Sequence, residues 1–183
     1  MKHPRASNWF SPAYLAARKL DPEVRSWLDD QGSLTKRLMN FCPGQFSVRV
    51  LSQCWVRAEI EETRLLQIPP RQRVLLRQVQ LYCGDRVCVY ARSLIPLKTL
   101  KGKHQRLRYL GTRPLGGYLF SNPRLRREQQ HLASLARKDP LFDIALSGST
   151  QRGEQIWGRR SLFTIDRKPL LVSEFFLPAL FEK

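Results

Sequence analysis

The sequence predicts a single α+β domain over residues 1–183, in which helices flank an antiparallel β-sheet. Two observations predict this class. The apolar segments with strand-like alternation follow one another as hairpins, whereas a doubly wound parallel sheet would alternate strands with helices. The 183 residues fit one domain, and a hydrophobic fraction of 42% is sufficient for one packed core.

Two short helices are expected near the beginning of the chain. Asp21 is typical of a helix cap and Pro22 of a first helical position, so one helix starts here and ends at Gly32. Ser33 has the side chain of a cap for a second short helix, which ends before Pro43.

Strands are expected next. Residues 46–51 and 55–60 alternate between apolar and polar types, which is typical of half-buried strands. Residues 74–83 and 87–95 flank a Gly-Asp turn and predict a hairpin.

The second half of the chain mixes helices with a last pair of strands. A helical segment is expected over 104–110, a glycine-rich turn over 114–117 and a longer helix over 126–138. The polar stretch 141–155 is predicted to be a loop. A final hairpin is expected to join 161–165 to 170–177.

The charge balance indicates an anionic partner. Lysine and arginine number 32 against 15 acids, which gives a net charge of +17. Nucleic acid, an anionic membrane surface and small acidic substrates all fit this charge, and so does a basic surface that serves only solubility. A basic nucleic-acid-binding protein is therefore one alternative, although no zinc-finger, RRM or helix-turn-helix pattern is present.

Cysteine and histidine content predicts neither a metal site nor a secreted protein. The four cysteines show no C-x-x-C spacing and only three histidines occur. We expect free thiols in a reducing cytoplasm, although Cys83 and Cys88 flank a turn and could pair. A secretory signal and an apolar run of about 18 residues are both missing, so a cytoplasmic protein without an integral membrane segment is expected.

Two charged residues interrupt apolar strand faces. Alternate residues of a strand share a face, so Arg77 falls among leucines and a valine, and Glu174 falls among apolar residues on either face. A buried unpaired ion costs several kcal/mol, so each needs a partner. The two can pair with each other, or they can line a pocket and hold a polar ligand, because an arginine fork fits a carboxylate and a glutamate can bond a hydroxyl.

Two further features are weaker candidates. Arg92 lies on a strand face with Tyr90 and Leu94, and the alternative is an edge arginine that reaches solvent. The turn at Leu115 and Gly116 offers backbone N–H groups that can bind an anion, and the alternative is a plain connecting turn. Nucleotide-binding loops and serine-nucleophile motifs do not occur.

Several segments together resemble the chorismate lyase (chorismate–pyruvate lyase) family. The most specific are Leu110-Gly111-Thr112-Arg113-Pro114-Leu115-Gly116-Gly117 and Trp157-Gly158-Arg159-Arg160-Ser161, and the resemblance spans most of the chain in order. It implies a cofactor-independent and metal-independent carbon–oxygen lyase that converts chorismate to 4-hydroxybenzoate and pyruvate for ubiquinone biosynthesis. It also implies an internal ligand cavity under flap segments. We expect the protein to be a monomer.

The resemblance also implies the roles of individual residues. The carboxylate-binding arginine corresponds to Arg77, and the acid that contacts the ring hydroxyl corresponds to Glu174. Backbone amides of Leu34 and Leu115 would assist the carboxylate. Apart from the resemblance, we expect Arg92 to be a weaker contact to the enolpyruvyl carboxylate.

Two features depart from the family pattern. Leucine stands at position 34 where methionine is expected, and the stretch 129–155 is a longer connection than usual. Two further readings stay open: a non-catalytic small-molecule-binding domain of the same fold, and a weak association of the basic surface with anionic membranes.

Overall fold

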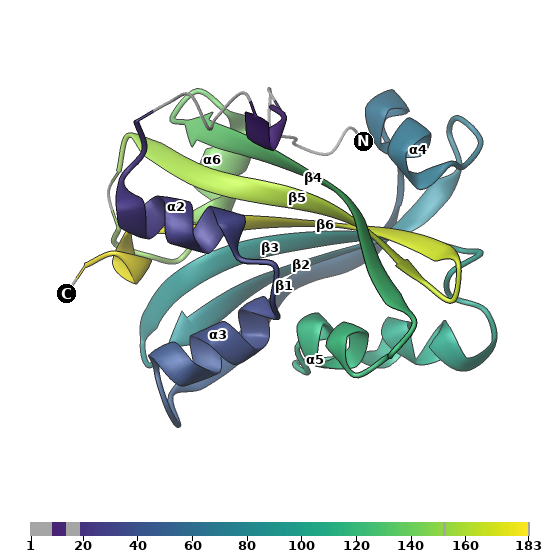
Figure 1. Ribbon diagram of the computed structural model, residues 1–183, viewed down its shortest axis with the longest axis horizontal. Helices are drawn as coiled ribbons and strands as arrows, with labels where there is room; N and C mark the ends of the chain where they lie inside the picture. Colours follow the sequence, from purple (N-terminus) through teal and green to yellow (C-terminus); the bar gives the residue numbers. More distant parts are fainter. Residues whose placement is uncertain (1–8, 14–18, 152, 183) are drawn as a thin grey trace.

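The computed structural model describes residues 9–13, 19–151 and 153–182, and within them six strands form one antiparallel sheet in the order β1-β2-β3-β6-β5-β4 (Figure 1). The predicted α+β class with an antiparallel sheet is confirmed. The strands are β1 (Phe46–Arg57), β2 (Arg73–Cys83), β3 (Arg86–Pro96), β4 (Leu125–Ala136), β5 (Gln155–Ile165) and β6 (Lys168–Phe176).

Helices cover both faces of this sheet (Figure 1). One face packs against α2 (Pro22–Asp29), α3 (Leu34–Phe41) and α5 (Leu115–Phe120). The other face packs against α4 (Ile60–Leu66) and α6 (Pro140–Ala145). The 3-10 helices are η1 (Gly102–Tyr109) and η2 (Pro178–Leu180). We call the first face the cavity face and the second the α4 face.

Local sequence signals predicted the first helices and both hairpins correctly. The Asp21 side chain accepts a hydrogen bond of 2.8 Å from the backbone N–H of Glu23, and Ser33 caps α3. The hairpins β2–β3 and β5–β6 form where turn residues interrupt alternating segments. In each case a few neighbouring residues carry the whole signal.

The predicted helix over 126–138 is wrong, because this segment is strand β4. Leu132 and Leu135 have helical spacing, but in the strand they point to opposite faces and join different core clusters. Both faces are covered at this end of β4, so apolar residues fall on both sides and the alternation typical of strands is lost. Pairing with β5 along the whole strand decides the conformation.

Three smaller predictions also fail. The predicted loop over 141–155 contains most of α6 and the first residue of β5, and the predicted strand over 55–60 instead ends at Arg57 and gives way to α4. Residues 46–57 form one strand with a bulge between Val50 and Ser52. The segment 114–117 is the start of helix α5 rather than a plain turn. That the stretch 129–155 is longer than in relatives stays a prediction.

The expectation of free thiols is wrong for two of the four cysteines. Cys42, at the end of α3, forms a disulfide with Cys83, at the end of β2, with a Cα–Cα distance of 5.7 Å. Cys54 and Cys88 are free, so the pair suggested by the β2–β3 turn does not form. The 41 residues between the bonded cysteines hide their proximity in the sequence.

Candidate active site

A small cavity of about 50 Å³ lies between the cavity face and the first turns of α3 and α5. Three of the predicted site residues, Leu34, Leu115 and Glu174, line it. Leu34 and Leu115 are the first residues of their helices, where backbone N–H groups have no partner within the helix. The remaining lining residues are Gly32, Thr35, Leu81, Ala91, Gly116, Leu119, Phe120, Arg127, Phe163 and Val172.

Glu174 is held by an arginine that sequence reasoning did not single out. Its Oε2 lies 2.6 Å from Nε of Arg159, directly across the β5–β6 ladder. Arg159 is fully buried, whereas the Glu174 side chain keeps 15% of its surface exposed. A buried, hydrogen-bonded cation at this distance fixes the position of the carboxylate. Because Glu174 also lines the cavity, this pair orients one acidic group toward a ligand space.

Two arginines tie the turn between α2 and α3 to the sheet. Nη1 of Arg159 donates to the carbonyl oxygens of Trp27, at 3.0 Å, and of Asp30. Arg127 of β4 also donates to the carbonyl of Asp30, at 3.2 Å, and its guanidinium lies 5.0 Å from the Phe163 ring centre. Burial and the nearby Arg159 cation both lower the pKa of Arg127. Arg127 also lines the cavity, so it places a cation in the cavity wall.

Two segments cover the cavity, and we call them the cover segments: the turn between α2 and α3 with the start of α3, and the loop before α5 with the start of α5. Arg77 lies on the cavity face and binds the second of them. Its Nη2 donates to the carbonyl oxygens of Gly111, at 3.0 Å, and Arg113, at 3.1 Å, in the loop that leads into α5. The side chain is buried, its Nε has no hydrogen-bond partner, and burial lowers its pKa. Arg77 is directly opposite Ser93, which in turn is opposite the cavity-lining Val172. Arg77 and Glu174 thus have different partners and do not neutralise each other.

The two cover segments touch each other through a glycine. A Cβ added to Gly116 would lie 2.5 Å from Oγ1 and 3.3 Å from Cβ of Thr35. These distances are shorter than normal contact, so only glycine permits this approach of α5 to α3. The cavity is closed on this side by the Gly116–Thr35 contact.

The structure does not bring Arg92 to this cavity. Arg92 is one residue after Ala91, the partner of Glu174 in the β3–β6 ladder, so its side chain lies on the α4 face. There its Nη1 forms an ion pair of 3.2 Å with Oε1 of Glu62, and both side chains are buried. The alternation in the sequence shows which neighbours share a strand face with Arg77 or with Arg92. It does not show whether the two arginines lie on the same face of the sheet, because that depends on the register between strands.

Arg127 and Arg159 are the residues that sequence reasoning missed. Arg159 alternates with Trp157, Ser161 and Phe163, the same kind of interrupted apolar face that singled out Arg77. The predicted strand began at Ser161, which left Arg159 outside it. Arg127 fell inside the wrongly predicted helix.

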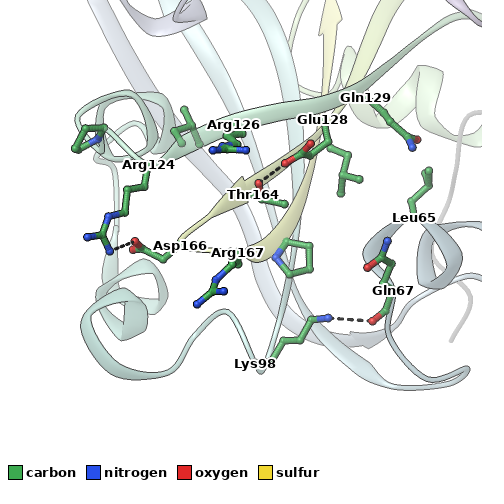
Figure 2. A pocket seen from close by; sticks show the side chains of 14 residues that line it. Leu65, Gln67, Lys98, Arg124, Arg126, Glu128, Gln129, Thr164, Asp166 and Arg167 are labelled. Carbon is green, nitrogen blue, oxygen red and sulfur yellow. Dashed lines mark hydrogen bonds and ion pairs between the residues drawn. The ribbon is translucent and has the colours of Figure 1, made fainter.

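A second hollow lies on the surface, away from the cavity. It is an open cleft of about 960 Å³ that lies between the start of β4, the β5–β6 turn and the end of α4 (Figure 2), and no predicted site residue lines it. Among the described residues, no group of three or more histidine, cysteine or acidic side chains could hold a metal ion. The same residues include no helix that is long and apolar enough to cross a membrane.

Known proteins of similar sequence point to one family. The sequence profile described as chorismate lyase matches residues 4–183. The "Probable chorismate pyruvate-lyase" of Methylococcus capsulatus is 43% identical over 157 residues, covering 86% of this chain and 96% of that protein. The protein of the same description from Azoarcus sp. is 40% identical over 186 residues, covering 98% and 96%.

Solved structures agree on the fold. PhnF from Mycobacterium smegmatis has a TM-score of 0.61 at 12% identity and covers 82% of this chain and 66% of that chain. The effector domain of PhnF has a TM-score of 0.59 at 13% identity and covers 82% and 91%. Identities this low show the fold alone, whereas the sequence matches are much stronger. The chain therefore belongs to the chorismate lyase family, and it is a carbon–oxygen lyase.

Proposed function

We propose that this chain cleaves chorismate to 4-hydroxybenzoate and pyruvate, the first committed step of ubiquinone biosynthesis. The observation that carries the proposal is the small cavity with Glu174 in its wall and the first residues of α3 and α5 beside it, in a chain of the chorismate lyase family. No cofactor or metal is part of the proposal, because elimination from chorismate produces an aromatic ring and aromatisation supplies much of the driving force.

Chorismate carries two carboxylates, and two arginines can receive them. Arg77 would bind the ring carboxylate together with the amides of Leu34 and Leu115, as the family resemblance implies. Arg127 is the better candidate for the enolpyruvyl carboxylate, because it lines the cavity whereas Arg92 is paired on the α4 face. This assignment replaces the weaker expectation for Arg92.

Substrate binding requires the cover to move. The cavity of about 50 Å³ holds one or two water molecules, which is far less than a substrate of chorismate's size needs. Nη2 of Arg77 donates to the carbonyls of Gly111 and Arg113, while its buried Nε has no partner, so a carboxylate that binds Nε and Nη2 together would exchange the carbonyl bonds for its own. Entry of the substrate and release of the α5 loop are therefore coupled through one side chain.

The chemistry needs orientation and the removal of one proton. The ether C–O bond breaks, enolpyruvate leaves and gains a proton to become pyruvate, and the ring carbon that bears the hydroxyl loses its proton. Glu174 would hold the ring hydroxyl beside the breaking bond, and Arg159 would keep the carboxylate in position. Closure of the apolar cover excludes water while the ring becomes aromatic.

The direct test is to incubate the purified protein with chorismate, without added metal, and to identify the products. Formation of 4-hydroxybenzoate and pyruvate supports the proposal, and formation of 3-hydroxybenzoate would contradict the stated regiochemistry. We expect Arg77→Ala to raise KM by about 100-fold or more, because it removes a bidentate carboxylate contact. Glu174→Ala should mainly lower kcat. Nearly unchanged kinetics in both variants would remove these assignments.

We also propose that the enzyme acts as a cytoplasmic monomer whose basic surface associates weakly with anionic membranes. The net charge of +17 supports the membrane part of this proposal, because each basic residue near an anionic surface contributes about 1 kcal/mol. Sedimentation with vesicles that contain an anionic lipid, at low and high salt, tests it. Salt-sensitive binding supports the association, and no binding at low salt contradicts it.

A further inference from the structure

A second polar cluster lies on the outer side of α5, away from the cavity. His104 of η1 is buried, with 1% of its side chain exposed. Its Nδ1 lies 2.7 Å from the Tyr118 hydroxyl of α5, and its Nε2 lies 2.8 Å from Oδ2 of Asp166 in the β5–β6 turn. Both imidazole nitrogens are engaged, and the proposed lyase chemistry uses none of the three groups.

His104 and Tyr118 line a surface pocket of about 410 Å³, together with three cationic side chains. The cations are Lys103, Arg106 and Arg124, and Asp166 contacts two of them, at 2.7 Å from Lys103 and 3.2 Å from Arg124. Figure 2 shows the Arg124–Asp166 ion pair, at the border with the larger cleft. Three cations and one carboxylate leave two positive charges without a local counter-charge.

We propose that this pocket binds a small tetrahedral dianion, the phosphate group of free phosphate or of a phosphate monoester. A dianion balances the two uncompensated charges, and lysine and arginine donate several charge-assisted hydrogen bonds to phosphate oxygens. The donors come from two segments, η1 and the residues before β4, so they surround the pocket rather than form one row. Leu115 and Leu119 of the same short helix α5 line the catalytic cavity, so the two sites lie on two sides of one helix.

Protonation of His104 is expected to accompany binding. When the neutral imidazole donates from Nε2 to Asp166, its Nδ1 must accept the Tyr118 proton, which is then not available to an anion in the pocket. A protonated imidazole donates from both nitrogens, and the Tyr118 O–H becomes free to donate to the anion. Binding of the dianion and protonation of His104 therefore favour each other.

The charges around His104 explain why the free protein resists this protonation. Burial lowers the pKa of His104 most, the Asp166 carboxylate raises it, and the Lys168 and Lys103 cations lower it. Arg106 and Arg124 also line the pocket. A bound dianion offsets these cations, which removes part of the opposition to a charged imidazole.

The first experiment measures binding of inorganic phosphate to the full chain by calorimetry, in chloride at about pH 8, where phosphate is a dianion. The variant Lys103→Gln/Arg106→Gln should weaken binding about tenfold or more, because charge-assisted hydrogen bonds are lost. The matched control is Arg126→Gln, which removes a cation of the neighbouring cleft and should change affinity by about twofold or less. No measurable binding, or an equal loss in the control, would overturn the proposal.

A parallel titration with glycerol phosphate distinguishes the two sources of the phosphate group. Tighter binding of glycerol phosphate than of phosphate assigns the site to a monoester, and the reverse assigns it to free phosphate. Chorismate turnover without phosphate should be the same in the wild type and in Lys103→Gln/Arg106→Gln, so a failure of the lyase proposal leaves this test unaffected.

The second experiment uses sulfate, which stays a dianion between about pH 5 and pH 8, so that any pH dependence belongs to the protein. Wild-type affinity should rise as pH falls, and His104→Gln should bind sulfate with no such rise. Tyr118→Phe keeps the aromatic ring and should bind sulfate more weakly at about pH 5. A pH dependence that is identical in the wild type and in His104→Gln would contradict the coupling.

Discussion

The two faces of the sheet bury the same residue types with different consequences. On the α4 face, Arg92 is paired with Glu62 and Arg160 with Glu61, at 3.2 and 2.7 Å, and each pair ties α4 to the sheet. Glu62 also accepts the backbone N–H of Glu59 in the capping box of α4. None of these residues lines one of the pockets described above, so the two ion pairs serve to hold α4 on the sheet.

On the cavity face, the arginines bind main-chain carbonyls of the cover instead of facing acids from a packed helix. Arg77 holds the loop before α5, and Arg127 and Arg159 hold the turn before α3. Glu174 keeps a side open to the cavity. The comparison teaches that a buried arginine marks a ligand site only when its partner can be exchanged. A carbonyl of a loop can be replaced by a substrate carboxylate, whereas a buried glutamate without its arginine leaves an unpaired ion.

The first test of this comparison asks whether loss of a buried arginine on the α4 face lowers the stability of the protein without changing KM. Arg92→Met should destabilise the protein by about 3–5 kcal/mol, because Glu62 is left buried without a partner, while KM of the folded fraction stays unchanged. Denaturant unfolding and steady-state kinetics measure the two effects.

The control for this variant removes both partners. Arg92→Met/Glu62→Leu should recover most of the lost stability, because an apolar pair replaces a buried ion pair. A raised KM in Arg92→Met at temperatures where it is fully folded would show that the α4 face takes part in substrate binding.

The second test acts on the contact between the two cover segments. Gly116→Ala should destabilise by about 1–3 kcal/mol and lower activity, because its Cβ would overlap Thr35 and push α5 from α3. The matched control is Gly117→Ala, whose Cβ would lie 3.9 Å from its nearest neighbour, Pro114 Cγ. This control should be neutral or slightly stabilising, since alanine favours a helix. Equal behaviour of the two variants would show that the close approach is unimportant.

The third test separates Arg127 from its neighbour in β4. Arg127→Gln should raise KM about tenfold, because one carboxylate contact of the cavity is lost. Arg126→Gln removes the same charge from the preceding residue, which does not line the cavity, and should leave KM within about twofold. Arg127→Lys keeps the charge but loses the fork, so an intermediate KM is expected.

The smallest expected effect concerns a histidine on each side of the sheet. Burial lowers the pKa of His104, and burial followed by the Arg160 cation lowers the pKa of His131. The unfolded chain therefore binds more protons than the folded one, and stability should fall as pH drops below about 6.5. In chloride without phosphate or sulfate, His104→Gln and His131→Gln should each flatten this decline in pH-dependent unfolding. A slope that neither variant changes would assign the decline to other groups.

Sequence reasoning found the elements whose signals are local. Asp21 before Pro22 marks α2, and glycine at 84 marks the first hairpin, because caps and turns depend on a few neighbouring residues. It also found Arg77 and Glu174, because a charge on an apolar strand face is visible without knowledge of the partner strand. The same Asp-Pro signal stood unused before α6, at Asp139 and Pro140.

The sequence by itself therefore determined the fold class and which charged groups had to find partners. Only the tertiary structure decided the partners: Arg159 for Glu174, loop carbonyls for Arg77, Glu62 for Arg92 and Cys83 for Cys42. It also decided that 125–136 is a strand, since burial on both faces removes the alternation that identifies one. The physical reason is common to all of these. Each partner is distant in sequence, and its position follows from the order and register of the strands, which no local pattern contains.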